Sequence, residues 1–331
     1  MSQPQKIAVI GGGSWATAIV KILCENIDRL GWWMRNEEAI AHIQKHGHNP
    51  NYISAAELKK EKLNISSDLN AIISEADCLV LAIPSAFLKE TLIQLKVDIK
   101  DKFIVSAIKG IVPENNTIIG DFFHNQYQIP YRNIGVVTGP CHAEEVALER
   151  LSYLTVACED VEKTKWFAEQ ITCRYIKTNV SEDIFGTEIA AVLKNVIAIA
   201  SGICHSLGYG DNYQAVLVSN AIREIKRFVD VLHPIKRDIK ESAYLGDLLV
   251  TTYSQFSRNR TFGNMIGKGY SVRSAQLEMN MVAEGYYAVK CIKEINEKYG
   301  VIMPITDAVY HILYEKISPV IEMRLLSNQL N

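Results

Sequence analysis

The first half of the chain alternates short, continuously apolar runs with segments of helical periodicity. Within each run the apolar residues are continuous and do not alternate with polar ones, which is typical of strands buried on both faces of a sheet. Strands that alternate with helices predict a parallel, doubly wound α/β sheet. The clearest runs are 6–11, 30–35, 77–84, 103–110 and 134–140, and two more, 153–159 and 173–178, extend the predicted sheet.

The pattern changes after about residue 180, beyond which no comparable strand is predicted. Over residues 184–207, apolar side chains recur every three or four positions, which predicts one face of a long helix. We expect Gly208, Gly210 and Asp211 to end this helix. The second part of the chain is therefore predicted to be all-helical.

Length and composition fit this division. A chain of 331 residues exceeds a typical domain of about 100–200 residues, so we predict an α/β domain of residues 1–180 and a helical domain of residues 181–331. The 48% apolar and 22% charged residues are those of an ordinary folded protein. A formal net charge of -2 does not suggest the broad basic surface that nucleic acid binding usually needs, whereas a small anionic substrate requires only a local basic pocket.

The cysteines and the apolar segments bear on cellular location. The seven cysteines form no C-x-x-C pair and lie mostly in apolar stretches, which predicts reduced, packed side chains. Residues 1–6 lead directly into the first predicted strand without the apolar core of a signal peptide. Residues 189–204 are apolar but are interrupted by Lys194 and Asn195, and they fall short of the roughly 20 residues of a membrane span. We expect a cytoplasmic protein that does not insert into a membrane.

A glycine motif follows the first predicted strand. In GGGSWATA, Gly11, Gly13 and Ala16 occupy the three small positions of the dinucleotide fingerprint G-x-G-x-x-G/A. Glycine permits a tight turn and a close backbone approach, and the N-terminus of the following helix presents N–H groups to a pyrophosphate. The alternative is a plain glycine turn between a strand and a helix.

The second predicted strand ends in Arg35, where a strict NAD site has an Asp or Glu that holds the ribose 2′-hydroxyl. An arginine at this position tolerates or favours a 2′-phosphate. Alternatively, Arg35 is a solvated residue, and Glu37 or Glu38 reaches the ribose. The pattern predicts NAD or NADP as the cofactor and leaves the choice open.

Two lysines are candidates for substrate chemistry. Lys109 closes the run 103–110 at the carboxyl edge of the predicted sheet, where it holds an anionic or carbonyl oxygen or else is an ordinary surface lysine. Lys194 lies within the apolar helix, where a desolvated lysine has a lowered pKa that suits proton exchange with a substrate hydroxyl. The alternative is a lysine that extends from the helix edge into water. The small residues that leave space on its face are Gly186, Ala190, Ala198 and Ser201.

The segment GDLLVTTYSQFSRNRTFG carries further polar candidates. Gly246 and Asp247 mark a predicted helix boundary, so Asp247 is either the N-cap of a helix 248–255 or a carboxylate that orients Lys194 and the substrate hydroxyls. Further along, a guanidinium beside two short polar side chains suits a phosphate group, with a solvated loop as the alternative. These three residues are Ser257, Arg258 and Asn259.

Together, these segments resemble the bacterial NAD(P)-dependent glycerol-3-phosphate dehydrogenase family. The similar blocks run in the family's order from residue 11 to residue 288. They are GGGSWATA, SAIKG, TGPCHAEE, SEDIFGTEIAAVLKNVIAIASGI followed by GYGDN, GDLLVTTYSQFSRNRTFG and VAEGYYA. The blocks around Lys194 and Asp247 are highly specific, whereas many dehydrogenases share the glycine fingerprint.

The resemblance implies a role for each matched residue. Lys194 is the implied proton donor and acceptor. Substrate contacts are implied for Lys109, Gly139, Cys141, Lys194, Asp247, Ser257, Arg258 and Asn259. Cofactor contacts are implied for Gly11, Gly13, Ser14, Trp15, Arg35, Tyr52, Lys109, Ala143, Arg258, Val282 and Glu284. No metal is implied.

The resemblance also implies a fold and a reaction. The fold is an N-terminal Rossmann-type doubly wound sheet with an all-helical C-terminal domain like that of 6-phosphogluconate dehydrogenase, assembled as a homodimer. The reaction is reversible hydride transfer between NAD(P)H and dihydroxyacetone phosphate, which yields sn-glycerol 3-phosphate for glycerophospholipid synthesis.

The sequence departs from the family pattern at three points. Ala16 replaces the usual third glycine, which the fingerprint allows. Cys141 stands where the family has a serine or threonine, so a hydrogen bond to the substrate is lost or weakened there. The stretch LVSNAIREI after Gln214 differs from the family's glycine- and arginine-bearing segment. None of these changes affects Lys194 or Asp247, so the predicted reaction type stands.

Two other functions share part of this pattern. A two-domain dehydrogenase acting on a sugar acid or a keto acid would have a similar fold but different polar residues around the helical lysine. A cofactor-sensing protein would keep the glycine fingerprint without turnover, and it would have no use for Lys109, Lys194 and Asp247.

Overall fold

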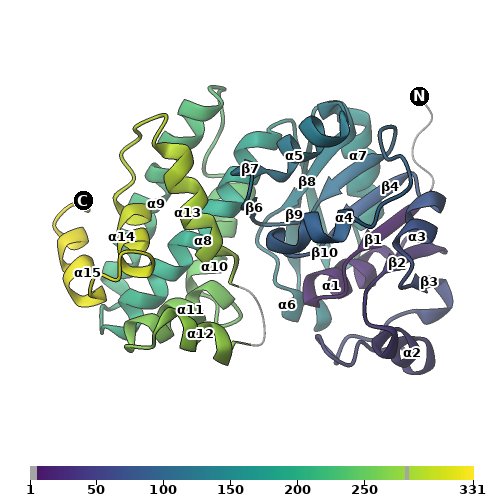
Figure 1. Ribbon diagram of the computed structural model, residues 1–331, viewed down its shortest axis with the longest axis horizontal. Helices are drawn as coiled ribbons and strands as arrows, with labels where there is room; N and C mark the ends of the chain where they lie inside the picture. The colour runs from purple at the N-terminus through teal and green to yellow at the C-terminus, as the bar shows by residue number, and fades with distance from the viewer. Residues whose placement is uncertain (1–5, 280–282) are drawn as a thin grey trace. The chain divides into compact units, whose positions relative to one another are not determined.

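The computed structural model of the protein describes residues 6–279 and 283–331. The chain forms two compact units (Figure 1). The sheet unit contains the residues up to 108 together with 119–184, and the helical unit contains residues 109–118 and 185–331. Each unit has its own hydrophobic core. The chain therefore passes from one unit to the other three times, at 108/109, 118/119 and 184/185.

The sheet unit is built on an eight-stranded sheet with the strand order β10-β9-β8-β5-β4-β1-β2-β3. Its central strands are buried at every position, which explains why the sequence shows continuous apolar runs there. The strands are β1 (Ile7–Ile10), β2 (Leu30–Trp33), β3 (Leu63–Ser66), β4 (Cys78–Leu81), β5 (Phe103–Ser106), β8 (Ile134–Thr138), β9 (Ser152–Cys158) and β10 (Ile176–Ser181).

Most of the sheet is parallel, which confirms the predicted doubly wound α/β fold. However, β9 pairs antiparallel with β8, and β10 is parallel to β9. The predicted parallel arrangement therefore does not extend to the pairing of β8 with β9. The connection from β8 to β9 contains only the five-residue helix α6 (Ala143–Ala147), and at about 1.5 Å per residue this helix is too short to run back along the sheet.

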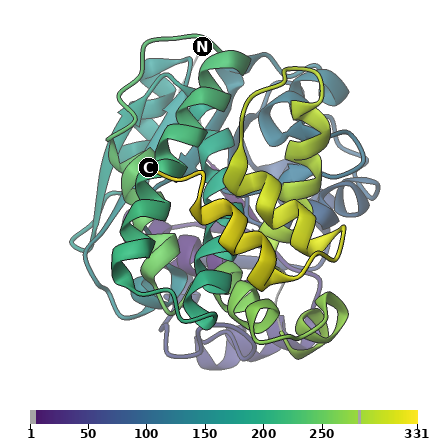
Figure 2. The same ribbon diagram turned by 90° about the vertical axis from the view of Figure 1, so that its left-hand side faces the viewer.

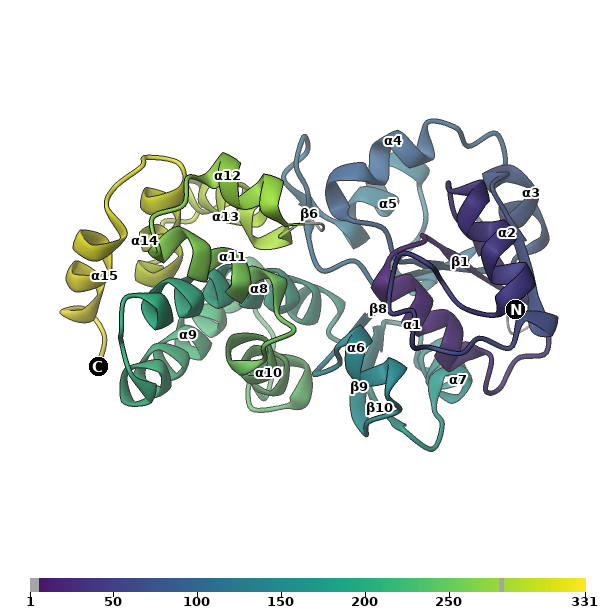
Figure 3. The same ribbon diagram turned by 90° about the horizontal axis from the view of Figure 1, so that it is seen from below.

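Helices cover both faces of the sheet (Figure 3). On one face, α1 (Ser14–Leu23) packs against α6 and α7 (Val161–Ile171). The other face carries α3 (Leu69–Glu75), α4 (Leu88–Leu92) and α5 (Ile119–Tyr127), and α2 (Glu37–His46) connects β2 to β3. The described part of the unit also contains 3-10 turns at Lys60–Lys62, Ser85–Phe87 and Tyr131–Asn133.

The helical unit has no strand after β10 among the residues that the structure describes, as the sequence predicts. A π-helical turn, Ser242–Gly246, leads directly into α10. In Figure 2 the last helices of this unit, α14 and α15, are drawn in yellow. Its helices are α8 (Ile184–Ser206), α9 (Asp211–Leu232), α10 (Asp247–Tyr253), α11 (Arg258–Gly267), α12 (Val272–Glu278), α13 (Glu284–Asn296), α14 (Pro304–Leu313) and α15 (Pro319–Ser327).

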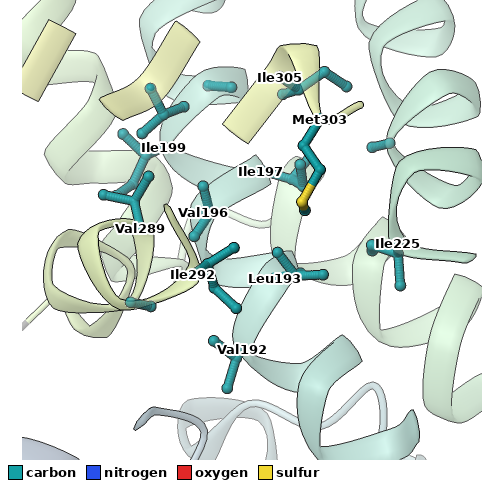
Figure 4. Close-up of a cluster of buried hydrophobic side chains, with 14 of the residues drawn as sticks. Val192, Leu193, Val196, Ile197, Ile199, Ile225, Val289, Ile292, Met303 and Ile305 are labelled. Atoms are coloured by element: carbon teal, nitrogen blue, oxygen red, sulfur yellow. The ribbon is translucent and has the colours of Figure 1, made fainter. Parts of the chain in front are cut away.

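The core of the helical unit forms around α8. Val192 and Val196 of α8 lie beside Val289 and Ile292 of α13, and Ile305 of α14 belongs to the same cluster (Figure 4). Helix α11 approaches α8 still more closely because both helices present glycines. A Cβ atom added at Gly202 would lie 2.0 Å from the carbonyl oxygen of Arg260, and one added at Gly263 would lie 2.1 Å from the carbonyl oxygen of Ile199.

Helix α8 corrects two expectations. The prediction that this segment is too short for a membrane span is wrong, because the 23-residue helix is long and apolar enough by length and composition; 94% of its most apolar window is buried inside the protein. The helix ends at Ser206, just before Gly208, whose φ is +84°. Gly210 and Asp211 do not end α8 but begin α9, at its N-cap and its first position.

A short hairpin of β6 (Ile111–Val112) and β7 (Thr117–Ile118) follows β5 but belongs to the helical unit. Its residues Ile111 and Ile118 are buried in the helical core. The hairpin and strand β3 are both absent from the strands that the sequence predicts. The hairpin matters for function because Lys109 comes two residues before it.

Candidate active site

Lys194 lies in the middle of α8, and its side chain is only 6% exposed. The apolar residues before and after Lys194 pack in the core of the helical unit, so the lysine between them is buried as well. Its Nζ donates to Asp247 Oδ1 at 2.5 Å and to Thr251 Oγ1 at 3.0 Å. A lysine ammonium has three N–H groups, so one can still be directed at a ligand oxygen.

Asp247 is the first residue of α10, and its side chain is 1% exposed. The N-cap position of α10 belongs to Gly246, which continues the preceding π-helical turn with helical backbone angles. Asp247 instead accepts from Lys194 at Oδ1 and faces Lys109 Nζ at 3.5 Å with Oδ2. Of the two roles considered for Asp247, the N-cap of a helix 248–255 is wrong, and the orienting carboxylate stays a prediction to which the contact with Lys194 conforms.

Lys109 joins these residues from a different part of the chain. It lies between β5 and β6, in the segment that belongs to the helical unit, and its side chain is 17% exposed. Asn195, the neighbour of Lys194, donates from Nδ2 to the carbonyl oxygen of Lys109 at 2.9 Å. The structure thus brings together Lys109, Lys194 and Asp247 within one unit, although they are far apart in the sequence.

Burial sets the acidity of the central lysine. It lowers the pKa of Lys194 from 10.5 to about 7, because the charged form loses its hydration in the core. The Asp247 carboxylate opposes this shift, and the ammonium of Lys109 adds to it. A lysine of this kind can give up and regain a proton near neutral pH.

The small residues on the Lys194 face are buried, and at one of them another chain segment fills the space. Ser201 Oγ lies 2.9 Å from Gln214 Oε1 of α9 and 2.9 Å from the carbonyl oxygen of Thr252 of α10. Ala190 and Ala198 are also buried. At Ser201, the space on this face is therefore filled by the protein itself.

The tripeptide predicted to bind phosphate opens α11 and is not a solvated loop. Ser257 Oγ accepts from the backbone N–H of Arg260 at 3.3 Å and so caps the helix. Asn259 Oδ1 accepts from the backbone N–H of Gly285 at 2.9 Å, at the start of α13. The Ser257 hydroxyl hydrogen and the Asn259 amide hydrogens are still donors that suit an anion, next to the half-exposed Arg258.

The glycine motif forms the turn between β1 and α1, as its position in the sequence predicts. Gly11 has φ +136°, and an added Cβ atom would lie 2.4 Å from the carbonyl oxygen of Ala82, so only glycine fits. A Cβ atom added at Gly13 would meet no atom within 4 Å. Because α1 begins at Ser14 without a capping side chain, the positive end of its dipole suits a dinucleotide pyrophosphate.

The region after β2 contains the residues considered for the ribose. Arg35 is exposed, as is Glu38. Glu37 accepts a hydrogen bond from Ser67 Oγ at 3.0 Å, which already engages one of the two carboxylates considered for the ribose. Tyr52 is half-buried in the loop after α2. Both NAD and NADP are compatible with these residues.

The other proposed ligand contacts lie in different parts of the chain. Gly139 follows β8 with φ +118°, and an added Cβ atom would lie 2.7 Å from the carbonyl oxygen of Tyr153, so its backbone requires glycine. Cys141 and Ala143 are buried in the core of the sheet unit. Glu284 begins α13 in the helical unit, and Val282 lies outside the described residues. Across residues 6–279 and 283–331, no cluster of His, Cys, Asp and Glu is placed to hold a metal ion.

Comparison with known protein families covers both units. Residues 6–164 match the N-terminal domain of NAD-dependent glycerol-3-phosphate dehydrogenases, and residues 183–323 match the C-terminal domain of the same enzymes. The chain belongs to the NAD-dependent glycerol-3-phosphate dehydrogenase family. The resemblance inferred from the sequence blocks is thereby confirmed.

Individual glycerol-3-phosphate dehydrogenases are similar over their whole length. The enzyme named glycerol-3-phosphate dehydrogenase (NAD(P)+) from Bacillus licheniformis is 33% identical over 322 residues, covering 96% of this chain and 93% of that protein. The protein of the same name from Staphylococcus aureus is 35% identical over 320 residues, covering 95% of each. The crystal structure of glycerol-3-phosphate dehydrogenase from Coxiella burnetii matches with a TM-score of 0.89 at 26% identity, covering 97% of this chain and 98% of that one.

Two polar residues of this chain are in contact with the site but absent from the predicted set. Thr251 Oγ1 accepts from Lys194 and lies 2.6 Å from the carbonyl oxygen of Asp247. Its signal in the sequence is its spacing, because residues four apart share a helix face. Asn195 holds the backbone of Lys109, and its signal is a second polar residue inside an apolar run.

Proposed function

We propose that this protein catalyses the reversible, NAD(P)-dependent reduction of dihydroxyacetone phosphate to sn-glycerol 3-phosphate. The observation that carries the proposal is the buried contact of Lys194 with Asp247, beside Lys109, in a chain of the glycerol-3-phosphate dehydrogenase family. The product is the glycerol phosphate from which glycerophospholipids are made, so the enzyme belongs to lipid synthesis.

In this proposal Lys194 moves the proton. When the carbonyl carbon of dihydroxyacetone phosphate is reduced, negative charge develops on its oxygen, and the Lys194 ammonium stabilises this charge and then donates a proton. Asp247 and Thr251 hold the ammonium in place through their hydrogen bonds. In the oxidation of glycerol 3-phosphate, the neutral amine of Lys194 accepts the hydroxyl proton.

The other substrate contacts are proposed to hold the anionic end and the hydroxyl groups. Lys109 contributes a second ammonium beside Asp247. Arg258, with the donors of Ser257 and Asn259, suits the phosphate, because a guanidinium offers paired N–H groups to its oxygens. Gly139 and Cys141 complete the proposed set, and at Cys141 the thiol is a weaker hydrogen-bonding partner than the hydroxyl that the family usually has.

The cofactor is proposed to bind at the N-terminus of α1. Gly11, Gly13, Ser14 and Trp15 would hold the pyrophosphate, and Arg35 and Tyr52 the adenosine side. Ala143 and the residues Lys109, Arg258, Val282 and Glu284 complete the proposed contacts. When bound, the nicotinamide supplies or takes up the hydride.

We also propose that the enzyme works in the cytoplasm as a homodimer. The cytoplasmic location is supported by the burial of α8 in the helical core and by the seven cysteines, none of which forms a disulfide in the described residues. The homodimer is supported by family membership and is tested by light scattering during gel filtration.

The decisive experiment follows the absorbance of NADH and NADPH with two ketones. We expect rapid oxidation with dihydroxyacetone phosphate and slow oxidation with dihydroxyacetone, because the Arg258 cluster then lacks its anion. Equal kcat/KM for the two ketones would refute the phosphate site, and turnover of a keto acid in place of both would point to the alternative dehydrogenase. Arg35→Ala should raise the KM for NADPH but not for NADH; equal effects would remove Arg35 from the 2′-phosphate site.

A further inference from the structure

The chain directly after Lys109 is held by the β6–β7 hairpin. In this hairpin Ile111 pairs with Ile118, and Val112 pairs with Thr117. The side chains of Ile111 and Ile118 are 2% and 6% exposed, and both belong to the core of the helical unit. The place of the Lys109 backbone therefore depends on how this hairpin is held against the helices of the unit.

Two side-chain amides hold this segment, each to a different helix. At the Lys109 end, Asn195 of α8 donates to the Lys109 carbonyl oxygen at 2.9 Å. At the far end, Asn116 Nδ2 donates to Glu294 Oε2 of α13 at 2.5 Å. A hydrogen bond to a carboxylate is stronger than one between neutral groups. The proposed mechanism uses neither Asn116 nor Glu294.

The backbone of Asn116 suits this contact. Its φ is +50°, in the left-handed region that asparagine and glycine adopt more readily than other residues. The turn therefore favours these two residue types, and of the two only asparagine also supplies a side-chain amide, which here reaches α13. Glu294 has a second neighbour, Lys290, whose Nζ lies 3.8 Å from Oε1.

We propose that Asn116 and Glu294 are positioning residues that fix Lys109 relative to Lys194 and Asp247 by holding the β6–β7 hairpin to α13. Lys109 Nζ lies 3.5 Å from Asp247 Oδ2, so a small movement of the hairpin changes this distance directly. The inference rests on the proposed function, because it concerns the residues that bind and protonate dihydroxyacetone phosphate.

Displacement of Lys109 has two measurable consequences. Substrate binding weakens because one ammonium leaves the site. The proton equilibrium of Lys194 also changes, because the groups that act on its ammonium are Asp247, Lys109 and the hydroxyl of Thr251. Since the charge of Lys109 lowers the pKa of Lys194, its withdrawal raises that pKa.

Four variants of the full chain separate this role from general stability. Asn116→Gly keeps the left-handed turn and removes the amide, and Glu294→Ala removes the acceptor. Glu294→Gln is the conservative rescue because it keeps an acceptor oxygen. Lys290→Ala is the control that removes the other neighbour of Glu294 and leaves the contact with Asn116 in place.

The experiment measures three quantities in each variant: KM for dihydroxyacetone phosphate, the pH dependence of kcat, and the titration of Lys194. The titration is followed by lysine-resolved NMR of the cofactor-free protein. For Asn116→Gly and Glu294→Ala we expect KM to rise roughly 3- to 10-fold. The fall of kcat with increasing pH and the titration of Lys194 should both move to higher pH. Glu294→Gln and Lys290→Ala should remain within about twofold of the parent.

Folded Asn116→Gly and Glu294→Ala proteins with the parent's KM and the parent's Lys194 titration would overturn the proposal. If Asn116→Gly does not fold, the comparison of Glu294→Ala with Glu294→Gln decides by itself. A parent protein that does not reduce dihydroxyacetone phosphate would refute the proposed function instead, and the Lys194 titration would still test the role of the hairpin.

Discussion

Lys194 keeps a charged group at a depth where lysines are rarely found. Its side chain is 6% exposed, and the desolvation that results is balanced by one carboxylate at 2.5 Å and one hydroxyl at 3.0 Å. Desolvation outweighs these contacts enough to bring the pKa of Lys194 to about 7, so the ammonium and the neutral amine are both populated near neutral pH. An acid that holds its proton loosely near neutral pH can also act as the base of the reverse reaction.

Replacement of this lysine tests the proton-transfer role. Lys194→Met should lower kcat by about 10²- to 10⁴-fold, the usual contribution of general acid catalysis. The fold should survive, because Lys109 remains as a charged partner of Asp247. Steady-state kinetics, with thermal unfolding and NADPH fluorescence as controls, measure these effects. Asp247→Asn should lower kcat less, since it orients the lysine but transfers no proton.

A kcat for Lys194→Met within about tenfold of the parent would contradict the assignment. Lys109 would then be the first residue to consider as the proton donor.

The lowered pKa of Lys194 predicts opposite pH dependences for the two directions. Reduction of dihydroxyacetone phosphate needs the ammonium, so kcat should be constant below the pKa of about 7 and fall above it. Oxidation of glycerol 3-phosphate needs the neutral amine, so kcat should rise with pH through the same range. Initial rates in both directions between pH 5 and about 10, under saturating substrates, provide the measurement. Both limbs centred near the ordinary lysine pKa of about 10.4 would show that burial does not tune this group.

At the scale of the elements, glycines set how closely α8 and α11 approach. Both helices carry residues of the candidate site: Lys194 lies on α8, and Ser257 to Asn259 are at the start of α11. Since the backbone of each helix touches a glycine of the other, their separation is fixed by main-chain atoms and not by flexible side chains.

This contact predicts a large effect of a single methyl group. Gly263→Ala would place a Cβ atom 2.1 Å from the carbonyl oxygen of Ile199, so the helices must separate. We expect the free energy of unfolding to fall by about 1–3 kcal/mol or more, measured by urea denaturation, with a reduced kcat. Gly210→Ala is the matched control, because its Cβ would meet no atom within 4 Å. An equal loss of stability in both variants would exclude the close helix contact as the cause.

The sequence predicts those elements whose burial is uniform. Strands β1, β4 and β5 are buried at every position and appear as apolar runs, and α8 appears as a clear helical period. Strand β3 (LNIS) is not predicted, because it is an edge strand in which Asn64 and Ser66 interrupt the apolar pattern. The antiparallel direction of β9 is not predicted either, since an apolar run has the same composition in either direction.

The candidate site is predicted to a similar extent and for related reasons. Lys194 stands out because a charge interrupts an apolar helix. Thr251 does not, because a threonine in a helix has many ordinary roles and only its contact with Lys194 distinguishes it. The hairpin contact of Asn116 with Glu294 joins residues 178 positions apart, which no local pattern can reveal.

At the scale of the whole molecule, the two units have separate cores. For a chain of this size with two cores, we expect thermal unfolding to depart from a two-state transition. NADPH should stabilise the sheet unit and so raise its transition temperature. At a concentration 100 times its Kd, the free energy of unfolding should rise by about 2.7 kcal/mol. Differential scanning calorimetry with and without NADPH makes the measurement. A single transition with equal calorimetric and van't Hoff enthalpies would contradict the expectation.

The excursion of residues 109–118 into the helical unit constrains how this enzyme can be recombined with its relatives. A chimera joined once near residue 184 would combine a helical half from one parent with a Lys109 segment from the other. Lys109 and the β6–β7 hairpin would then come from one parent, and the residues that they contact, Asp247 and those of α13, would come from the other. Gene fusions that exchange cofactor preference should therefore carry three junctions, near 108, 118 and 184, so that residues 109–118 are inherited with the helices that they contact.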